Sequence, residues 1–172
     1  MPANRLDSKL ESVGAEFLVL GHLLIEGVHA FKSYTDYPGY DILATSEETG
    51  KECRIQVKSR WATDFNRHFP MRTFECDFVV VVALNRGYQK IRKKSPEDTG
   101  RMEPAYYIIP ADLVRAAQKP GSKLGIVPMK NIPDIEQKYK DNWQLILEAL
   151  GIERKQYPGL SRIFNATETS LE

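Results

Sequence analysis

Near the start of the chain, apolar residues recur at steps of four and three, the spacing of an amphipathic helix. The stripe consists of Leu6, Leu10, Val13, Phe17, Leu20 and Leu24. Gly27 is a natural stop, because glycine readily adopts the left-handed conformation that ends helices. The small pair Gly14-Ala15 precedes Glu16 and would let another element come close. We therefore take Glu16 as a candidate to face a crevice.

After residue 27 the period changes from about 3.6 to 2, which predicts β-strands. Strands are expected over 28–33, 40–45, 52–58, 78–84 and 105–109. The valine-rich run at 78–84 is typical of a central strand covered on both faces. A short helix over 111–119, an irregular stretch over 120–135 and a second amphipathic helix near 136–150 complete the pattern. This order predicts an α/β fold in one domain, 1–172.

A carboxylate and an amine stand at matching places on two consecutive strands. Asp41 opens one strand after the turn-forming pair Pro38-Gly39, and Gln56 and Lys58 lie on the next strand. Because side chains alternate along a strand, Gln56 and Lys58 point to the same face. Neighbouring strands can bring Asp41 and Lys58 into one small site, an arrangement that suits metal-assisted attack on a phosphodiester.

Composition is that of a soluble globular protein, with 42% hydrophobic and 27% charged residues among 172. No apolar run approaches the roughly 18 residues of a membrane helix, and the N-terminus has no signal-peptide core, so we expect a cytoplasmic protein. Cys53 and Cys76 have neither metal spacing nor a disulfide framework, which predicts buried, reduced thiols. Phosphate-binding Gly-rich loops, a nucleophile elbow and zinc-ligand clusters are all missing from the sequence.

Charge is distributed unevenly. Residues 1–50 hold three Lys and Arg against eight Asp and Glu, a net −5. Residues 51–94 hold eleven against four, a net +7, and residues 95–172 hold ten against eleven, a net −1. The basic block in the middle of the chain points to a polyanionic partner, although a solvated surface produces the same pattern.

The order of these elements and residues resembles the PD-(D/E)XK nuclease superfamily. The resemblance spans residues 6–118 and rests on Gly14-Ala-Glu16, Gly39-Tyr-Asp41-Ile-Leu, Ile55-Gln-Val-Lys58-Ser and Cys76-Asp-Phe-Val-Val-Val-Val82. It implies a restriction-endonuclease-like core over 6–118, with a central mixed β-sheet flanked by helices, followed by an α-helical C-terminal extension over 119–172. It also implies a DNA endonuclease that depends on Mg²⁺ or Mn²⁺. A homodimer is expected, because one site of this kind cuts one strand.

By resemblance, Asp41 is the central metal ligand, Glu16 a second ligand, and the backbone carbonyl of Val57 a third. Lys58 would orient the attacking water and offset negative charge in the transition state. Gln56 stands where the family has Asp or Glu. Its amide oxygen can assist as a ligand but brings no charge. Some members of the superfamily with glutamine here remain nucleases, whereas others have degraded sites and only bind.

Cations interleaved with aromatic residues follow the Gln-X-Lys strand, a composition suited to phosphate contacts and base stacking. The candidate nucleic-acid contacts are Arg60, Trp61, Arg67, His68 and Arg72, together with the basic arm that carries Lys90, Arg92, Lys93 and Lys94. DNA is the expected partner and RNA stays an alternative. Two other interpretations remain open: a degraded nuclease fold that binds nucleic acid or a protein without cleavage, and an unrelated α/β protein in which Asp41 and Lys58 form an ordinary ion pair.

Overall fold

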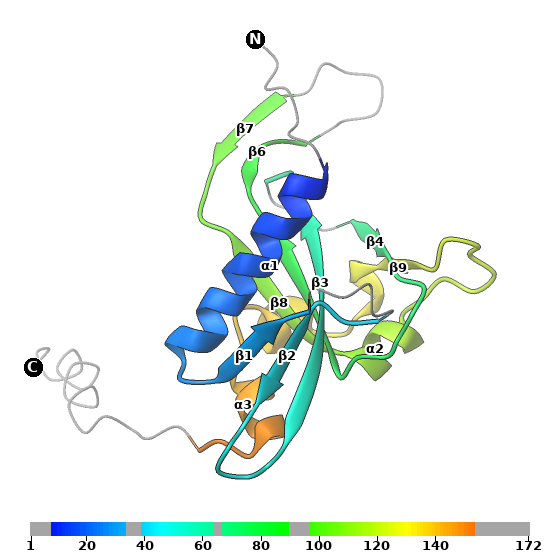
Figure 1. The fold of residues 1–172 in the computed structure, drawn as a ribbon. Helices are drawn as coiled ribbons and strands as arrows, with labels where there is room; N and C mark the ends of the chain where they lie inside the picture. Colours follow the sequence, from blue (N-terminus) through cyan, green and yellow to red (C-terminus); the bar gives the residue numbers. More distant parts are fainter. Residues whose placement is uncertain (1–7, 34–38, 64–66, 90–96, 154–172) are drawn as a thin grey trace, which may run out of the picture.

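The computed structural model describes residues 8–33, 39–63, 67–89 and 97–153. Its centre is a five-stranded sheet with strand order β1-β2-β3-β5-β8 (Figure 1). The strands are β1 (His29–Lys32), β2 (Ile42–Thr45), β3 (Glu52–Arg60), β5 (Phe78–Ala83) and β8 (Ala105–Pro110). All neighbours are antiparallel except β3 and β5, which run parallel. The predicted mixed sheet is confirmed, with strand limits within two residues of those expected.

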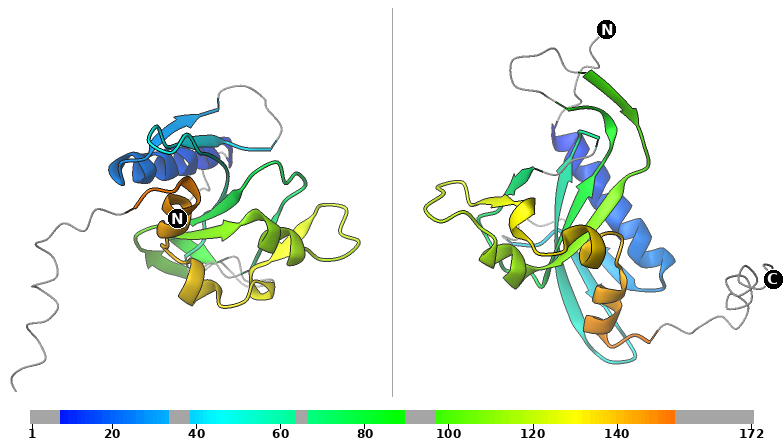
Figure 2. Two further views of the ribbon diagram at one scale, coloured as in Figure 1. Left: turned by 90° about the horizontal axis from the view of Figure 1, so that it is seen from below. Right: turned by 180° about the vertical axis from the view of Figure 1, so that it is seen from behind.

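β5 separates two hydrophobic clusters, one on each face of the sheet. Val80 and Val82 belong to the first cluster with residues of α1 (Ser8–Ile25) and α3 (Gln144–Leu150). Val79 and Val81 belong to the second with residues of α2 (Ala111–Ala116). Figure 2 shows α1 and α2 on different sides of the sheet. Every residue of β5 is buried, so the two-sided cover predicted from the valine run is confirmed.

The first helix is confirmed, but its packed face is not the predicted apolar stripe. The buried residues of α1 are Glu11, Ala15, Val19 and Leu23. Ala15 allows the helix to lie close to the sheet, while the larger Leu10, Phe17 and Leu24 remain exposed on the opposite side. The Glu11 carboxylate is buried at the end of β3, where it accepts a hydrogen bond from the Ser59 hydroxyl at 3.2 Å.

The second amphipathic helix is split. A π-helical turn, η2 (Ile135–Tyr139), is followed by an extended segment and only then by α3. Asp141 has a positive φ of 50° and binds the backbone of Tyr106 twice, through its own N–H at 2.6 Å and its carboxylate at 3.0 Å. Pairing with edge strand β8 therefore interrupts the helix that the sequence pattern predicts over 136–150.

Two small ribbons extend the structure. β4 (His68–Pro70) pairs with β9 (Ile126–Pro128), and a 3-10 helix, η1 (Met129–Asn131), follows directly. The sequence pattern predicts neither strand, because each spans only three residues. β6 (Arg86–Gln89) pairs with β7 (Glu97–Arg101), so the basic arm begins as a hairpin. Lys90, Arg92, Lys93 and Lys94 lie outside the described residues.

Other expectations can be checked directly. Cys53 and Cys76 are buried free thiols, as predicted. Over the described part of the chain, no helix has the length and apolar character needed to cross a membrane. The C-terminal third packs against both clusters, since α3 contributes to the first and Val127 and Met129 to the second.

Candidate functional site

Asp41 lies where β2 begins to leave β3. Its N–H still donates to the Ile55 carbonyl at 2.9 Å, but the preceding turn at Gly39 takes the chain away from β3. Gly39 has a φ of +127°, and a Cβ there would lie 2.6 Å from that of Glu75, so only glycine fits this turn. Because β2 has left this edge of β3, the Val57 N–H has no backbone carbonyl of β2 opposite it. It donates instead to the Asp41 carboxylate, at 2.6 Å.

Gln56 and Lys58 lie on the same face of β3, as predicted from strand alternation. The Gln56 amide donates to the same Asp41 oxygen at 2.5 Å. The N–H and C=O of one strand residue point to the same edge. Because the Val57 N–H reaches Asp41, the Val57 carbonyl also faces the edge that β2 has left. Asp41, Gln56 and the Val57 backbone therefore meet at one point.

Glu16 enters this region from α1 and forms an ion pair with Lys32 at the end of β1. Both side chains are largely withdrawn from solvent, with 12% of Lys32 and 15% of Glu16 exposed. Glu16 and Lys32 each interact electrostatically with Asp41. The crevice predicted for Glu16 is thus present. Lys32 is a member of the site that the sequence analysis missed, and its position on the inner face of β1 beside Ala30 was the available signal.

The pKa values of Asp41 and Lys58 are shifted in opposite directions. Burial raises the pKa of Asp41 and Glu16 adds to this, while the Val57 N–H, Lys58 and Lys32 oppose it. Burial lowers the pKa of Lys58 and Arg60 adds to this, while Asp41 opposes it. Two carboxylates and two amines share the site, so its formal charge is zero. Perturbed groups of this kind gather at functional sites, although structural ion pairs also produce them.

The oxygen atoms around Asp41 form a donor set for a hard divalent cation. It would comprise the carboxylates of Asp41 and Glu16, the Gln56 amide oxygen and the Val57 carbonyl. Mg²⁺ needs only one or two carboxylates and keeps several waters, so these oxygen donors fit it. Among the described residues, no three His, Cys, Asp or Glu side chains group as a metal-binding set. A cation here would depend on neutral oxygens for part of its coordination.

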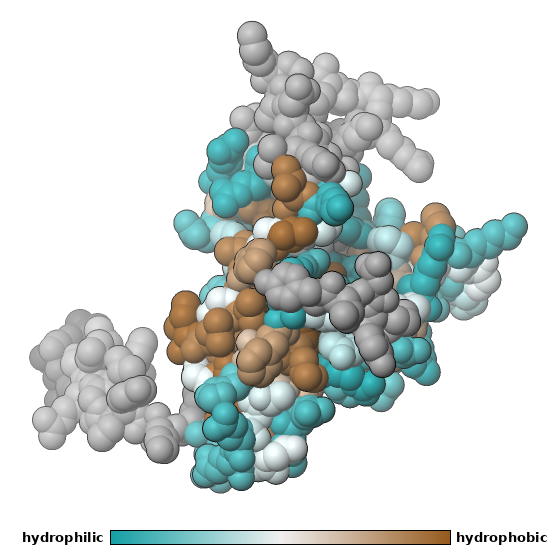
Figure 3. Space-filling view, in the orientation of Figure 1, coloured by the Kyte–Doolittle hydropathy of each residue, from teal (hydrophilic) through white to brown (hydrophobic). Residues whose placement is uncertain are grey.

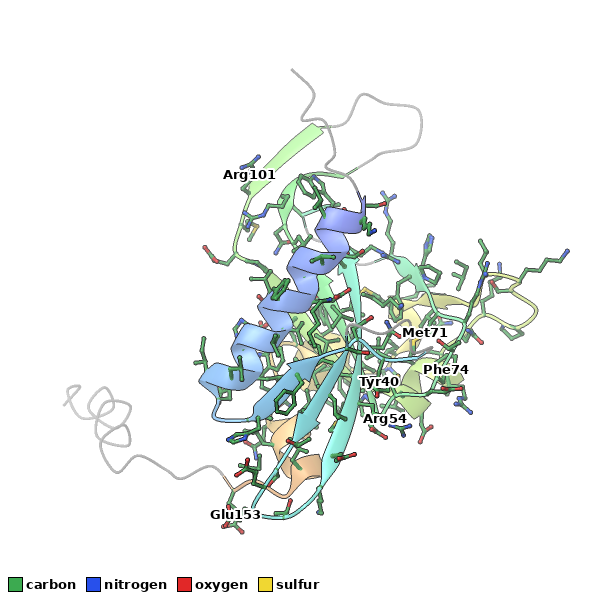
Figure 4. All side chains as sticks on the ribbon, in the orientation of Figure 1. Tyr40, Arg54, Met71, Phe74, Arg101 and Glu153 are labelled. Atoms are coloured by element: carbon green, nitrogen blue, oxygen red, sulfur yellow. The ribbon has the colours of Figure 1, made fainter. Side chains whose placement is uncertain are left out.

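Lys58 lines a cavity of about 770 Å³. We call it the basic pocket. Its lining residues are Lys58, Arg60, Arg67, His68, Pro70, Met71, Arg72, Thr73, Leu124 and Ile126. Four of the predicted nucleic-acid contacts, Arg60, Arg67, His68 and Arg72, thus lie around one opening with Lys58. Figure 4 shows Met71, which lines this pocket, and Phe74 on the same side of β3. Leu124 and Ile126 come from the β9 region, for which the sequence offered no signal.

The loop before β9 is held firmly against the pocket wall. The Gly125 carbonyl accepts from the Met71 N–H at 2.9 Å, and Gln118 donates to the Met71 carbonyl at 2.8 Å. A Cβ at Gly125 would lie 2.0 Å from the Met71 oxygen, so the contact requires glycine. The loop presents Leu124, which is 52% exposed, at the rim of the basic pocket.

Arg60 and Trp61 differ in role although they are adjacent. The Arg60 guanidinium donates to the Ser59 carbonyl at 2.6 Å and the His68 carbonyl at 3.3 Å, which joins β3 to β4. Trp61 packs against the first cluster, on the α1 side of the sheet, and does not line the basic pocket. Its Nε1 is buried without a hydrogen-bond partner among the described residues. The structure therefore corrects the prediction for Trp61, because strand alternation turns it toward the core.

Comparison with known proteins identifies the architecture. No protein-family model and no curated protein matches the chain by sequence. The structure is similar to that of a bacterial homing endonuclease, with 19% identity, a TM-score of 0.54 and coverage of 84% of this chain and 94% of the other. It is also matched to a Holliday junction resolvase from Archaeoglobus fulgidus, with 16% identity, a TM-score of 0.44 and coverage of 83% and 97%. Together with the sheet order and the helices on its two faces, the first similarity shows that the chain has the restriction-endonuclease-like fold of the PD-(D/E)XK nucleases.

Proposed function

We propose that the protein is a metal-dependent DNA endonuclease whose active site is built around Asp41. The observation that carries the proposal is the convergence of Asp41, Gln56 and the Val57 backbone beside Lys58, which lines the basic pocket. Fold alone does not establish activity, since one fold hosts many functions. The support comes from the site: oxygen donors, a buried amine and surrounding cations are the groups that phosphodiester hydrolysis needs.

In this proposal Asp41 and Glu16, assisted by the Gln56 amide oxygen and the Val57 carbonyl, hold one Mg²⁺ or Mn²⁺. When bound, the cation supplies Lewis-acid polarisation of the phosphate and lowers the pKa of a water ligand. For these residues to hold a cation, the Gln56 amide, whose nitrogen now donates to Asp41, would have to present its oxygen instead. The Glu16 carboxylate would have to leave its ion pair with Lys32.

The chain's own residues position the substrate. Lys58 lines the basic pocket, where its ammonium can donate to a phosphate oxygen and orient the attacking water. Arg67 and Arg72 at the pocket wall hold flanking phosphates, which fixes the backbone without reading its sequence. Bound in this way, the scissile phosphate lies between Lys58 and Asp41.

A second candidate is a nucleic-acid-binding module without cleavage. It is favoured by the Glu16–Lys32 ion pair and the uncharged Gln56, which together leave the site with no net negative charge to attract a cation. On this view the basic pocket binds the phosphate backbone, and the Asp41 cluster serves only to hold β2 against β3.

Nicking of supercoiled plasmid with Mg²⁺ or Mn²⁺ separates the two candidates. We expect cleavage by the wild type, loss of cleavage in Asp41→Ala and Lys58→Ala, and unchanged cleavage in Asp112→Ala, whose carboxylate is exposed on α2. Calorimetry should show cation binding by the wild type and not by Asp41→Ala. Cleavage that survives both site substitutions would refute the proposal. Salt-sensitive binding of DNA without cleavage would support the binding module, and an RNA duplex in parallel tests the substrate class.

A further inference from the structure

The ribbon of β4 and β9 has one face in the core and the other in the basic pocket. Phe69 and Val127 are paired across the ribbon, and both are fully buried in the second cluster. The next pair, Pro70 and Ile126, points to the opposite side, because side chains alternate along a strand. Both of these residues line the basic pocket. The ribbon therefore presents an apolar surface to a cavity whose other lining residues are mainly basic.

Leu124 extends this apolar surface beyond the ribbon. It is 52% exposed at the pocket rim, on a loop in which the Lys119 N–H donates to the Ile126 carbonyl at 2.8 Å and the Ile126 N–H to the Ser122 hydroxyl at 3.0 Å. In Figure 3 the largest hydrophobic area lies over α1 and β1, whereas the surface on the side of β4 and β9 is mainly hydrophilic with smaller hydrophobic patches. We call Pro70, Leu124 and Ile126 the apolar platform.

The basic pocket thus combines two kinds of lining, and a phosphate group needs only one of them. Lys58, Arg67 and Arg72 suit phosphate oxygens. The apolar platform suits the flat face of a nucleobase, which apolar side chains contact in pockets that hold single bases. The volume of about 770 Å³ lies within the roughly 300–1,000 Å³ of cavities that enclose whole ligands, so one nucleotide fits. A nucleotide with its phosphate on the cations and its base on the platform uses both linings.

Base pairing decides which nucleotides of a DNA strand can bind in this way. In a continuous duplex the bases are paired and stacked inside, and the outside offers phosphates and sugars. The face of a base becomes accessible only where the nucleotide is unpaired or has swung out of the stack. Swinging out costs least where the base has no pairing partner to give up. The apolar platform is therefore matched to an unpaired nucleotide.

We propose that the apolar platform binds the base of an unpaired nucleotide beside the phosphate held by Lys58, which makes DNA with an unpaired nucleotide the preferred substrate. The platform rests on the proposed function for its DNA strand, but it adds a preference that phosphate contacts alone do not supply, since phosphates are alike in every strand. The Arg60 guanidinium donates to the His68 carbonyl at 3.3 Å, which ties β3, the strand of Lys58, to the ribbon that carries the platform.

Equilibrium binding without divalent cations tests the platform independently of cleavage. The probes are a fluorescent DNA duplex and the same duplex with one unpaired adenosine. The wild type should bind the second about tenfold more tightly or better, the range that contact with one base contributes. In Leu124→Ser combined with Ile126→Thr, the ratio of the two affinities should fall to near one, and threonine keeps the β-branch that suits the strand. The matched control, Leu10→Ser combined with Ile25→Thr, changes residues of α1 that are 64% and 83% exposed, and it should keep the wild-type ratio.

Fluorescence gives an independent readout. With 2-aminopurine as the unpaired base, binding of the wild type should protect its emission from quenching by acrylamide, because the pocket encloses the base. The variant with Leu124→Ser and Ile126→Thr should give less protection. Deoxyadenosine monophosphate at the concentration of the duplex should not displace it, because a free nucleotide lacks the flanking phosphates that the other cations of the pocket hold.

Several results would overturn the platform: equal affinity for the two duplexes, an unchanged ratio in the platform variant, or loss of the ratio in the matched control. Displacement by equimolar deoxyadenosine monophosphate would also overturn it, by assigning the pocket to a free nucleotide. Absence of cleavage in the nicking assay would count against the endonuclease alone, because binding is measured without cations. Equal affinity together with cleavage would count against the platform alone, and binding of neither duplex would refute both.

Discussion

Replacing Gln56 by glutamate tests the arrangement of the site more directly than removing any group. The Gln56 amide nitrogen lies 2.5 Å from a carboxylate oxygen of Asp41, so Gln56→Glu exchanges a hydrogen-bond donor for a second negative charge at contact distance. Two unit charges about 4 Å apart repel by roughly 4 kcal/mol at an effective dielectric constant near 20. Relaxation and proton uptake reduce this, so we expect a loss of about 2–4 kcal/mol in the free energy of unfolding at neutral pH.

The loss should depend on pH with a defined sign. Two facing carboxylates share one proton, so one of them has a folded-state pKa above its unfolded value. A carboxyl group shifted in this direction favours folding at low pH and loses that contribution as pH rises through the folded pKa. The unfolded-state pKa of a glutamate is roughly 4.3, and the penalty of Gln56→Glu begins as pH rises above this value. The loss of stability should therefore be small near pH 4.5 and fully developed near pH 7.5.

Divalent cations should reverse the effect. A third carboxylate changes the formal charge of the site from zero to −1, so Mn²⁺ should bind Gln56→Glu about tenfold more tightly or better, a difference of ~1.4 kcal/mol. Urea unfolding at both pH values, with and without Mn²⁺, measures the loss of stability, its dependence on pH and the gain in Mn²⁺ affinity. Gln137→Glu adds the same charge at an exposed position and should leave them unchanged. If Gln56→Glu is as stable as the wild type at pH 7.5 and gains no cation affinity, Gln56 does not face Asp41 and our account of the site is wrong.

Three further predictions follow from neighbouring features. Lys58→Met should abolish nicking yet leave thermal stability at neutral pH equal or higher, because burial lowers the pKa of Lys58 and its charged form therefore opposes folding below that pKa. In filter binding, the double variant Arg67→Ala, Arg72→Ala should reduce the slope of log affinity against log salt by about 1.8, equally for unrelated DNA sequences; an unchanged slope would place both outside the phosphate path. Gly125→Ala should lower the free energy of unfolding by about 2 kcal/mol or more, since its Cβ would overlap a backbone oxygen at a φ of +63°. Gly121→Ala, with φ +70° and open space around it, should cost only about 1 kcal/mol, and equal losses in chemical denaturation would contradict the overlap.

The sequence alone predicted the sheet and much of the site because those features depend on local geometry. Alternation along an extended strand places Gln56 and Lys58 on one face whatever surrounds them. The valine run of β5 requires cover on both sides, and the Pro38-Gly39 turn before Asp41 marks where a strand can open. The short ribbon of β4 and β9 could not be predicted, because three residues are too few to show a period. Its central pair, Phe69 and Val127, also lies 58 residues apart along the chain.

Tertiary structure alone decided the partner of Glu16 and the exposed face of α1. In the sequence, Lys32 does not differ from any other lysine at the end of a strand. Only the packing of α1 on β1 brings it against Glu16. The spacing of apolar residues established that residues 8–25 form a helix, but both of its faces carry apolar residues. The sheet receives the face of Ala15, Val19 and Leu23, because a small residue at Ala15 lets the helix approach closely and bury more surface. Local periodicity thus determines that a helix forms, whereas the shape of the surface it meets determines which face remains exposed.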